Sequence, residues 1–172
     1  MKIVNGILFK ANWLACVIGG ALWGALGVIA LLGFSAFAGS IRKDLPLVVG
    51  LAGAGAVLDT AWIFFGILDY GAAFAPVWII MLWVGLALTL NHAFSFMVDR
   101  PLMGALFCGL AAPMTYLGGQ SLGAVVVPQP IMLGIIAVTW GILFWVVLRY
   151  LQGQQETEAG KLIVDPDESA AF

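Results

Sequence analysis

Long apolar runs separated by short polar turns fill the chain from its first residues to about residue 150. A helix needs roughly 20 apolar residues to cross the ~30 Å hydrocarbon core of a bilayer. Hydropathy therefore predicts transmembrane helices at about residues 3–19, 22–39, 45–68, 75–97, 102–119 and 129–150. The turns are short apart from the last, so consecutive helices should be antiparallel neighbours. The expected fold is an all-α, polytopic membrane bundle of about six transmembrane helices with short loops.

Composition supports this class of protein. Hydrophobic residues make up 63% of the chain and charged residues 9%, and the mean hydropathy is +1.08. In soluble domains about a quarter of the residues are charged. Cys16 and Cys108 are isolated and form no metal-binding or disulfide pattern. His92 is the only histidine and cannot supply two haem ligands. We therefore expect no metal, no cofactor and no nucleic-acid partner.

The basic residues predict the orientation of the bundle. With six spans, five basic residues fall at the face that carries both termini: Lys2, Arg42, Lys43, Arg100 and Arg149. The opposite turns contain no Lys or Arg. Cytoplasmic loops carry an excess of basic residues, so both termini should be cytoplasmic. A five-span arrangement would split these charges between the two faces.

The chain divides into residues 1–151, the predicted six-span domain, and residues 152–172, a polar tail. The tail holds five acidic residues against Lys161, a net charge of −4, which leaves +2 for the membrane part. Glycine, proline and charge are frequent in it, so we expect a flexible acidic extension in the cytoplasm. A solvated tail and a tail that binds a partner protein both fit this composition.

Polar side chains inside the predicted spans are the candidate site. Each costs about 2.5–3.5 kcal/mol on insertion scales, so it needs a partner or a function. Asp59 lies in the third span, and Thr115 and Tyr116 lie in the fifth. At a rise of about 1.5 Å per residue, Asp59 and Tyr116 are both about 21 Å from the cytoplasmic ends of their spans. They predict a polar layer past the midplane, with Trp62 one turn beyond Asp59. A purely structural Asp59 is the alternative.

Asn91 and His92 form a second polar pair, near the end of the fourth predicted span. They lie about 8–10 Å from its cytoplasmic end, the same depth as Lys10 in the first span. Ligand contact and hydrogen bonding between helices are equally good interpretations of this pair. Lys10 is shallow enough for its ammonium to snorkel to the headgroups. The depth estimate separates His92 from Asp59 by about 12 Å, which argues against an acid–base pair.

Nearly the whole chain, from Asn5 to about Arg149, resembles a bacterial membrane-protein family called domain of unknown function 2878. The residues that carry the resemblance are Asn5, Leu8-Phe9, Trp13, Cys16-Val17, Leu58-Asp59, Pro76, Trp78, Leu82-Trp83, Thr89-Leu90-Asn91-His92, Pro113, Tyr116, Gly118-Gly119 and Leu122-Gly123-Ala124. The chain departs at Lys10, where the family usually has glutamine, and at Asn12, where it has a small residue. The resemblance implies the bacterial inner membrane and a link to fatty-acyl metabolism.

Three functions remain open from the sequence. The first is a binding or accessory role for a lipid or apolar small molecule, with Asp59, Asn91, His92, Tyr116, Thr115 and Trp62 as binding residues. A few convergent polar groups in apolar walls are the usual form of a ligand site. The second is a small-molecule transporter or the substrate-binding membrane subunit of one. The third is an intramembrane enzyme with His92 as acid or base and Asp59 as its charge partner, which we favour least because the depth estimate separates the two residues. Besides these three functions, a purely structural or interaction role through the acidic tail is the remaining alternative. Membrane lipids are expected partners, and a homo-oligomer or a membrane partner protein is open.

Overall fold

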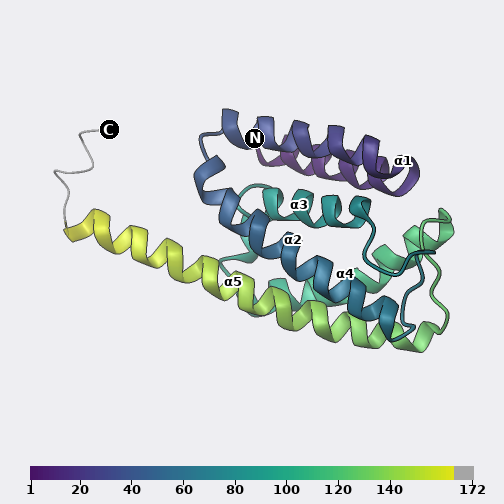
Figure 1. Ribbon diagram of the computed structural model, residues 1–172. Helices are drawn as coiled ribbons and strands as arrows, with labels where there is room; N and C mark the ends of the chain where they lie inside the picture. Colours follow the sequence, from purple (N-terminus) through teal and green to yellow (C-terminus); the bar gives the residue numbers. More distant parts are fainter. Residues whose placement is uncertain (165–172) are drawn as a thin grey trace.

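The computed structural model describes residues 1–164, and these are almost entirely helical (Figure 1). The α-helices are α1 (Lys2–Phe37), α2 (Ile41–Phe64), α3 (Val77–Leu90), α4 (Pro101–Ser121) and α5 (Leu133–Val164), with 3-10 turns η1 (Ser95–Met97) and η2 (Pro130–Met132). Within the described residues there is no β-strand, and only Asp69 and Val126 pair as an isolated bridge. The all-helical class is confirmed.

Four of these helices are long and apolar enough to cross a membrane: α1, α2, α4 and the stretch Pro130–Gly160, which includes most of α5. α3 is also apolar but has only 14 residues. The outward surfaces of the long helices are apolar as well, with many exposed leucine, isoleucine, valine and phenylalanine side chains. Such surfaces suit hydrocarbon and indicate a membrane protein.

α1 is not one straight helix, because Gly20 interrupts it. Gly20 has φ 67° and ψ −153°, a backbone region that is essentially restricted to glycine. The two halves run antiparallel, as the two purple coils in Figure 1 show. A side chain at Gly27 would overlap Asn12, so the glycine allows the halves to pack closely. This break lies where the sequence predicted the turn between its first two spans.

The predicted fourth span, 75–97, is wrong at its carboxyl end. α3 stops at Leu90, so Asn91 and His92 lie in the turn after the helix and not inside it. The backbone N–H groups of His92 and Phe94 both donate to the Thr89 carbonyl, each at 3.1 Å, which closes a tight turn. Asn5 holds this turn from α1, since its side chain donates to Leu88 O at 3.1 Å and accepts from the Ala93 N–H at 3.3 Å.

Two other boundaries differ from the sequence prediction. α2 ends at Phe64 and not at residue 68, because the chain turns at Gly66, whose φ is 66°. α5 continues to Val164, well past the predicted end of the last span at residue 150. The first part of the acidic tail therefore extends the last helix. Residues 165–172 lie outside the described part of the chain.

The helices form two packed groups. α3 lies between α1 and α2 and contacts both, while α4 packs along α5 (Figure 1). The α4–α5 contact is close at Gly109, where an added Cβ would lie 2.8 Å from Ala137 O and 3.3 Å from the Gly141 Cα. Small residues at such crossings allow backbones to approach in lipid. The space between the two groups holds the candidate site.

Candidate functional site

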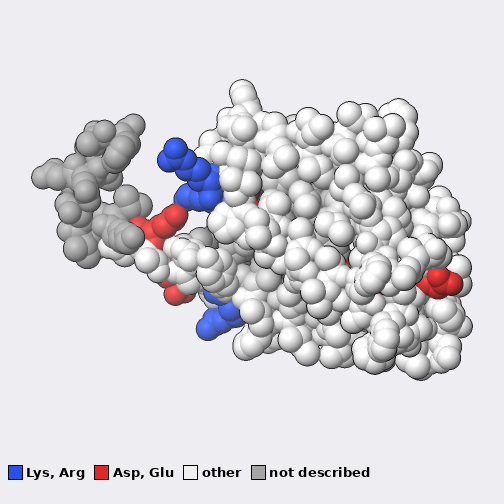
Figure 2. Space-filling view, viewed as in Figure 1, with Lys and Arg blue, Asp and Glu red and all other residues white. Residues whose placement is uncertain are grey.

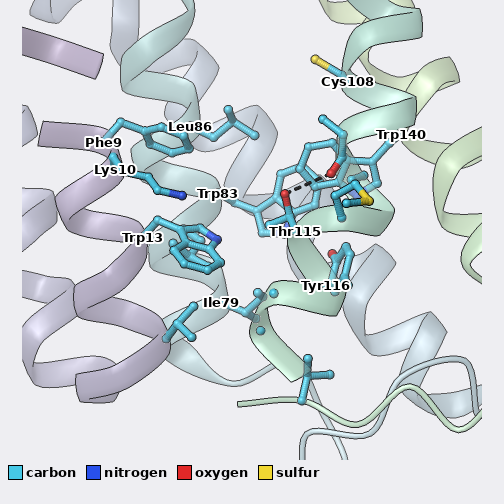
Figure 3. Close-up of a pocket in the computed structure, with 18 of the residues that line it drawn as sticks. Phe9, Lys10, Trp13, Ile79, Trp83, Leu86, Cys108, Thr115, Tyr116 and Trp140 are labelled. Carbon is cyan, nitrogen blue, oxygen red and sulfur yellow. Dashed lines mark hydrogen bonds between the residues drawn. The ribbon is translucent and has the colours of Figure 1, made fainter. Parts of the chain in front are cut away.

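A cavity of about 540 Å³ lies between the α1–α3 group and the α4–α5 group. α1 provides one wall, α3 the base, and α4 with α5 the facing wall (Figure 3). The lining is aromatic and aliphatic apart from a few polar atoms. It consists of Phe9, Lys10, Trp13, Val17, Tyr70, Trp78, Ile79, Leu82, Trp83, Leu86, Phe94, Met97, Phe107, Cys108, Ala111, Ala112, Met114, Thr115, Tyr116, Gly118, Gly119, Val125 and Trp140.

Two stacked tryptophan rings form part of the lining. Trp83 of α3 stacks on Trp140 of α5 with ring centroids 4.7 Å apart, and Trp140 stacks in turn on Phe144 at 5.2 Å. On its other side Trp83 lies against Gly55 of α2, where an added Cβ would overlap the indole ring. The stack therefore joins α2, α3 and α5, and its position depends on a glycine at residue 55.

Asp59 fixes the orientation of this aromatic wall. Its Oδ1 accepts hydrogen bonds from the Tyr70 hydroxyl at 2.6 Å and the Tyr116 hydroxyl at 3.3 Å. Its Oδ2 accepts from the Trp83 indole N–H at 2.8 Å. The three donors all line the cavity, whereas the carboxyl group is 0% exposed behind them. Because their polar atoms face Asp59, these residues present mainly ring surface to the cavity.

The predicted binding residues near Asp59 occupy different positions. Thr115 and Tyr116 line the cavity directly. Asp59 lies in a layer behind the lining and reaches the cavity only through its three donors. Trp62 is 3% exposed and packs edge-to-face on Tyr116 at 5.8 Å, outside the cavity. The polar layer predicted from depth thus exists as a group of contacting side chains around Asp59.

Sequence reasoning missed two members of this group. Tyr70 stood in a predicted turn, but the chain after α2 folds back so that its hydroxyl reaches Asp59. Trp83 was recognised only for its part in the family resemblance. Tyr70 also packs edge-to-face on Trp78 at 5.6 Å, which places the turn against α3. An aromatic residue with a hydrogen-bonding group near an intramembrane acid is the signal that could have indicated both.

Asn91 and His92 belong to a second cluster, centred on Asp44. Asp44 is 0% exposed near the start of α2. Its carboxylate accepts from Asn91 Nδ2 at 2.8 Å, from Ser40 Oγ at 2.8 Å and from the Ser35 hydroxyl, and it lies 3.0 Å from His92 Nε2. None of these residues lines the cavity. The cluster ties together the ends of α1, α2 and α3.

The geometry around His92 does not form a catalytic relay. A Ser-His-Asp triad uses one imidazole nitrogen for the serine and the other for the carboxylate. Here Nε2 is 3.0 Å from Ser40 Oγ and also 3.0 Å from Asp44 Oδ2, so one nitrogen serves both. Phe34 covers the ring edge-to-face at 5.2 Å, and the side chain is only 11% exposed. Asp44, which lies just before the predicted third span at 45–68, is the acidic partner of His92.

Outside the Asp59 and Asp44 clusters, the described residues offer few groups that could bind a metal ion or react. In residues 1–160, whose side chains are described, no group of three or more His, Cys, Asp or Glu side chains is placed to hold a metal ion. Cys108 lines the cavity with its thiol 3.9 Å from the Met97 sulfur, and Cys16 is buried against Asn12. The lining is therefore mainly apolar, and Lys10, Cys108 and Thr115 are among its few polar residues.

The fold and the cavity define a helical membrane protein with an aromatic internal site. A family model described as "Protein of unknown function (DUF2878)" matches residues 2–146, so the chain belongs to this family. No curated protein and no solved structure matches the chain. The match covers the whole helical region that builds the cavity and both polar clusters, and the family assignment confirms the resemblance seen in the sequence.

Proposed function

We propose that this protein binds a lipid or another apolar small molecule in the cavity between its two helix groups, and that it serves lipid metabolism as a binding or accessory protein. The observation that carries this proposal is the cavity itself. Its volume of about 540 Å³ lies within the range of roughly 300–1,000 Å³ that small-molecule sites occupy. Its walls are predominantly apolar, with polar groups at only a few positions.

Two features of the walls support a ligand. Four tryptophans contribute to the lining: Trp13, Trp78, Trp83 and Trp140. Flat rings give a large contact area at a small cost in side-chain entropy. The hydroxyls of Tyr70 and Tyr116 and the indole N–H of Trp83 are turned to Asp59, so these rings offer mainly apolar surface to a ligand.

The membrane arrangement proposed here is a bacterial inner-membrane protein with six crossings and cytoplasmic termini. The interruption of α1 at Gly20 supports two crossings within α1. α3, although short, lies between α1 and α2 in the middle of the bundle. The Lys and Arg side chains visible in Figure 2 gather at the end of the molecule where α5 extends beyond the bundle. Basic residues at one end support a cytoplasmic assignment of that end.

The test compares the wild type with a variant that fills the cavity. Ala111 lines the cavity, whereas its neighbour Leu110 is 74% exposed on the outer face of α4. Ala111→Phe adds a ring inside the cavity, and Leu110→Phe adds one outside as the matched control. Each protein is extracted gently and analysed by native mass spectrometry, and the bound lipids are compared with the bulk lipid.

We expect a discrete bound mass, or one lipid enriched over the bulk, in wild type and in Leu110→Phe. The same species should be lost or strongly reduced in Ala111→Phe. His92→Ala should keep it, because the Asp44 cluster lies away from the cavity. If no protein carries a molecule beyond bulk lipid, or if Ala111→Phe retains it, the binding proposal is refuted.

A further inference from the structure

Lys10 places a positive charge at the cavity. It lies in the first half of α1, three residues before Trp13, and its side chain is among those that line the cavity. The ammonium sits 4.4 Å from the centroid of the Trp13 ring. In Figure 3 the Lys10 side chain extends from α1 toward the interior of the cavity, with Thr115 on the α4 wall across from it. The ammonium thus lies against Trp13, one turn further along α1 from the chain start, whereas snorkelling would direct it toward the headgroups.

The charge of Lys10 has no acidic counterpart in its surroundings. The cavity lining contains no Asp or Glu, and Lys10 is its single charged residue. Across residues 1–160, the ion pairs found are Lys43–Glu158 and His92–Asp44, and neither includes Lys10. Asp59 lies behind the wall with its two oxygens occupied by three donors. Lys10 is therefore the one charged side chain on the cavity surface, and no described carboxylate forms an ion pair with it.

Lys10 and its neighbour Trp13 form a place where a negatively charged group could bind. Trp13 extends from α1 toward α4, where a Cβ at Gly118 would lie 3.6 Å from its ring. The ring supports the ammonium from one side through a cation–π contact. Lys10 is exposed and its ammonium makes no hydrogen bond to another described side chain, so its N–H groups can donate to a bound anion. An anion at this position would gain charge-assisted hydrogen bonds while an attached chain lay along the aromatic wall.

We propose that the molecule bound in the cavity is an amphiphile with an anionic head group, a carboxylate or a phosphate, which Lys10 recognises while the apolar chain packs on the aromatic wall. This inference rests on the proposed function, since it names the chemical class of the ligand for the same cavity. It predicts that binding discriminates by head-group charge, and that Lys10 alone carries the discrimination.

The tryptophans of the lining provide a direct readout of binding. Brominated acyl chains quench tryptophan fluorescence at contact, so a bound chain should quench Trp13, Trp83 and Trp140. The full chain is placed in nanodiscs of zwitterionic lipid at alkaline pH, where a fatty acid is ionised. Three probes with the same brominated chain are titrated: dibromostearate, its lysophosphatidate and the neutral dibromostearyl alcohol. The variants are Lys10→Gln, with Lys43→Gln as the control, because Lys43 is a cation outside the cavity.

In wild type and Lys43→Gln, at least one anionic probe should bind about tenfold more tightly than the alcohol, as expected for a hydrogen bond to a charged group. The anionic probe that binds more tightly identifies the head group as carboxylate or phosphate. Lys10→Gln should lose this preference, while the alcohol binds as before and the melting temperature is retained. Unchanged alcohol binding shows that the cavity in the variant is intact.

Two results overturn the inference, and they differ from a failure of the proposed function. If the alcohol binds wild type as tightly as both anions, head-group charge is not recognised. If Lys10→Gln keeps the preference for the anion, the head group lies elsewhere. Failure of the binding proposal has another signature, in which no probe quenches wild type or quenching by the alcohol is the same in Ala111→Phe.

Discussion

Replacing Asp59 by alanine removes the acceptor of three hydrogen bonds that join α2 to the turn at Tyr70, to α3 at Trp83 and to α4 at Tyr116. The side chain is 0% exposed, so water does not replace the lost carboxylate easily. The three donors would remain in an apolar environment without a partner. Asp59→Ala therefore tests whether this group holds the two helix groups in register around the cavity.

The magnitude follows from hydrogen bonds measured between membrane helices, which average about 0.6 kcal/mol and reach about 1.7. Three such bonds correspond to a loss of about 2–5 kcal/mol in the free energy of unfolding. For a chain of this size, each kcal/mol shifts the melting temperature by about 2–4 °C. Asp59→Ala should therefore melt several degrees below wild type. Asp59→Asn should lie between them, since the amide keeps one acceptor oxygen but turns an NH₂ group toward a donor.

The assay is thermal unfolding in a mild non-ionic detergent, followed by intrinsic tryptophan fluorescence. Asp99→Ala is the matched control, because Asp99 is exposed and makes no side-chain hydrogen bond in the described structure. Tyr70→Phe should lower the melting temperature more than Tyr116→Phe. The Tyr70 hydroxyl lies 2.6 Å from Asp59 Oδ1, whereas the Tyr116 hydroxyl lies 3.3 Å from it. In the Asp59→Ala background, Tyr70→Phe should cost nothing further. A melting temperature of Asp59→Ala equal to that of Asp99→Ala would refute this account of the site.

Three other predictions use the same assay. Gly55→Ala should lower the free energy of unfolding by about 1–3 kcal/mol, because the added Cβ overlaps the ring of Trp83. A variant as stable as wild type would mean that Trp83 does not pack against α2 at this position. Gly20→Ala should lower the free energy of unfolding by about 1–3 kcal/mol through backbone strain alone, since no atom lies within 4 Å of the added Cβ. An unchanged free energy of unfolding would argue against the break in α1. Lys43→Ala should change stability by less than about 1 kcal/mol, because its ion pair with Glu158 is exposed; a large loss would show that the end of α5 is held to α2 more firmly than this contact implies.

Several parts of the structure could be predicted from the sequence because they depend on local properties of the chain. Apolar runs of membrane length identify the class of protein and most of the helices. Gly19-Gly20 marks the interruption of α1, because glycine tolerates the required backbone angles. The similar depth of Asp59 and Tyr116 follows from their equal distance along two spans, since helix rise is constant, whereas their contact also requires that the two helices face each other.

The tertiary structure alone decided which polar groups meet. Asp44 becomes the partner of Asn91 and His92 because the turn after α3 comes to lie beside the start of α2. Asn91 is 47 positions and His92 is 48 positions away from Asp44 in the sequence. Tyr70 reaches Asp59 because the chain after α2 folds back against α3. Lys10 points into the cavity because α1 and α4 stand apart on opposite sides of it. Hydropathy and helix rise determine how deep a residue lies, whereas the direction of its side chain depends on how helices distant in sequence pack together.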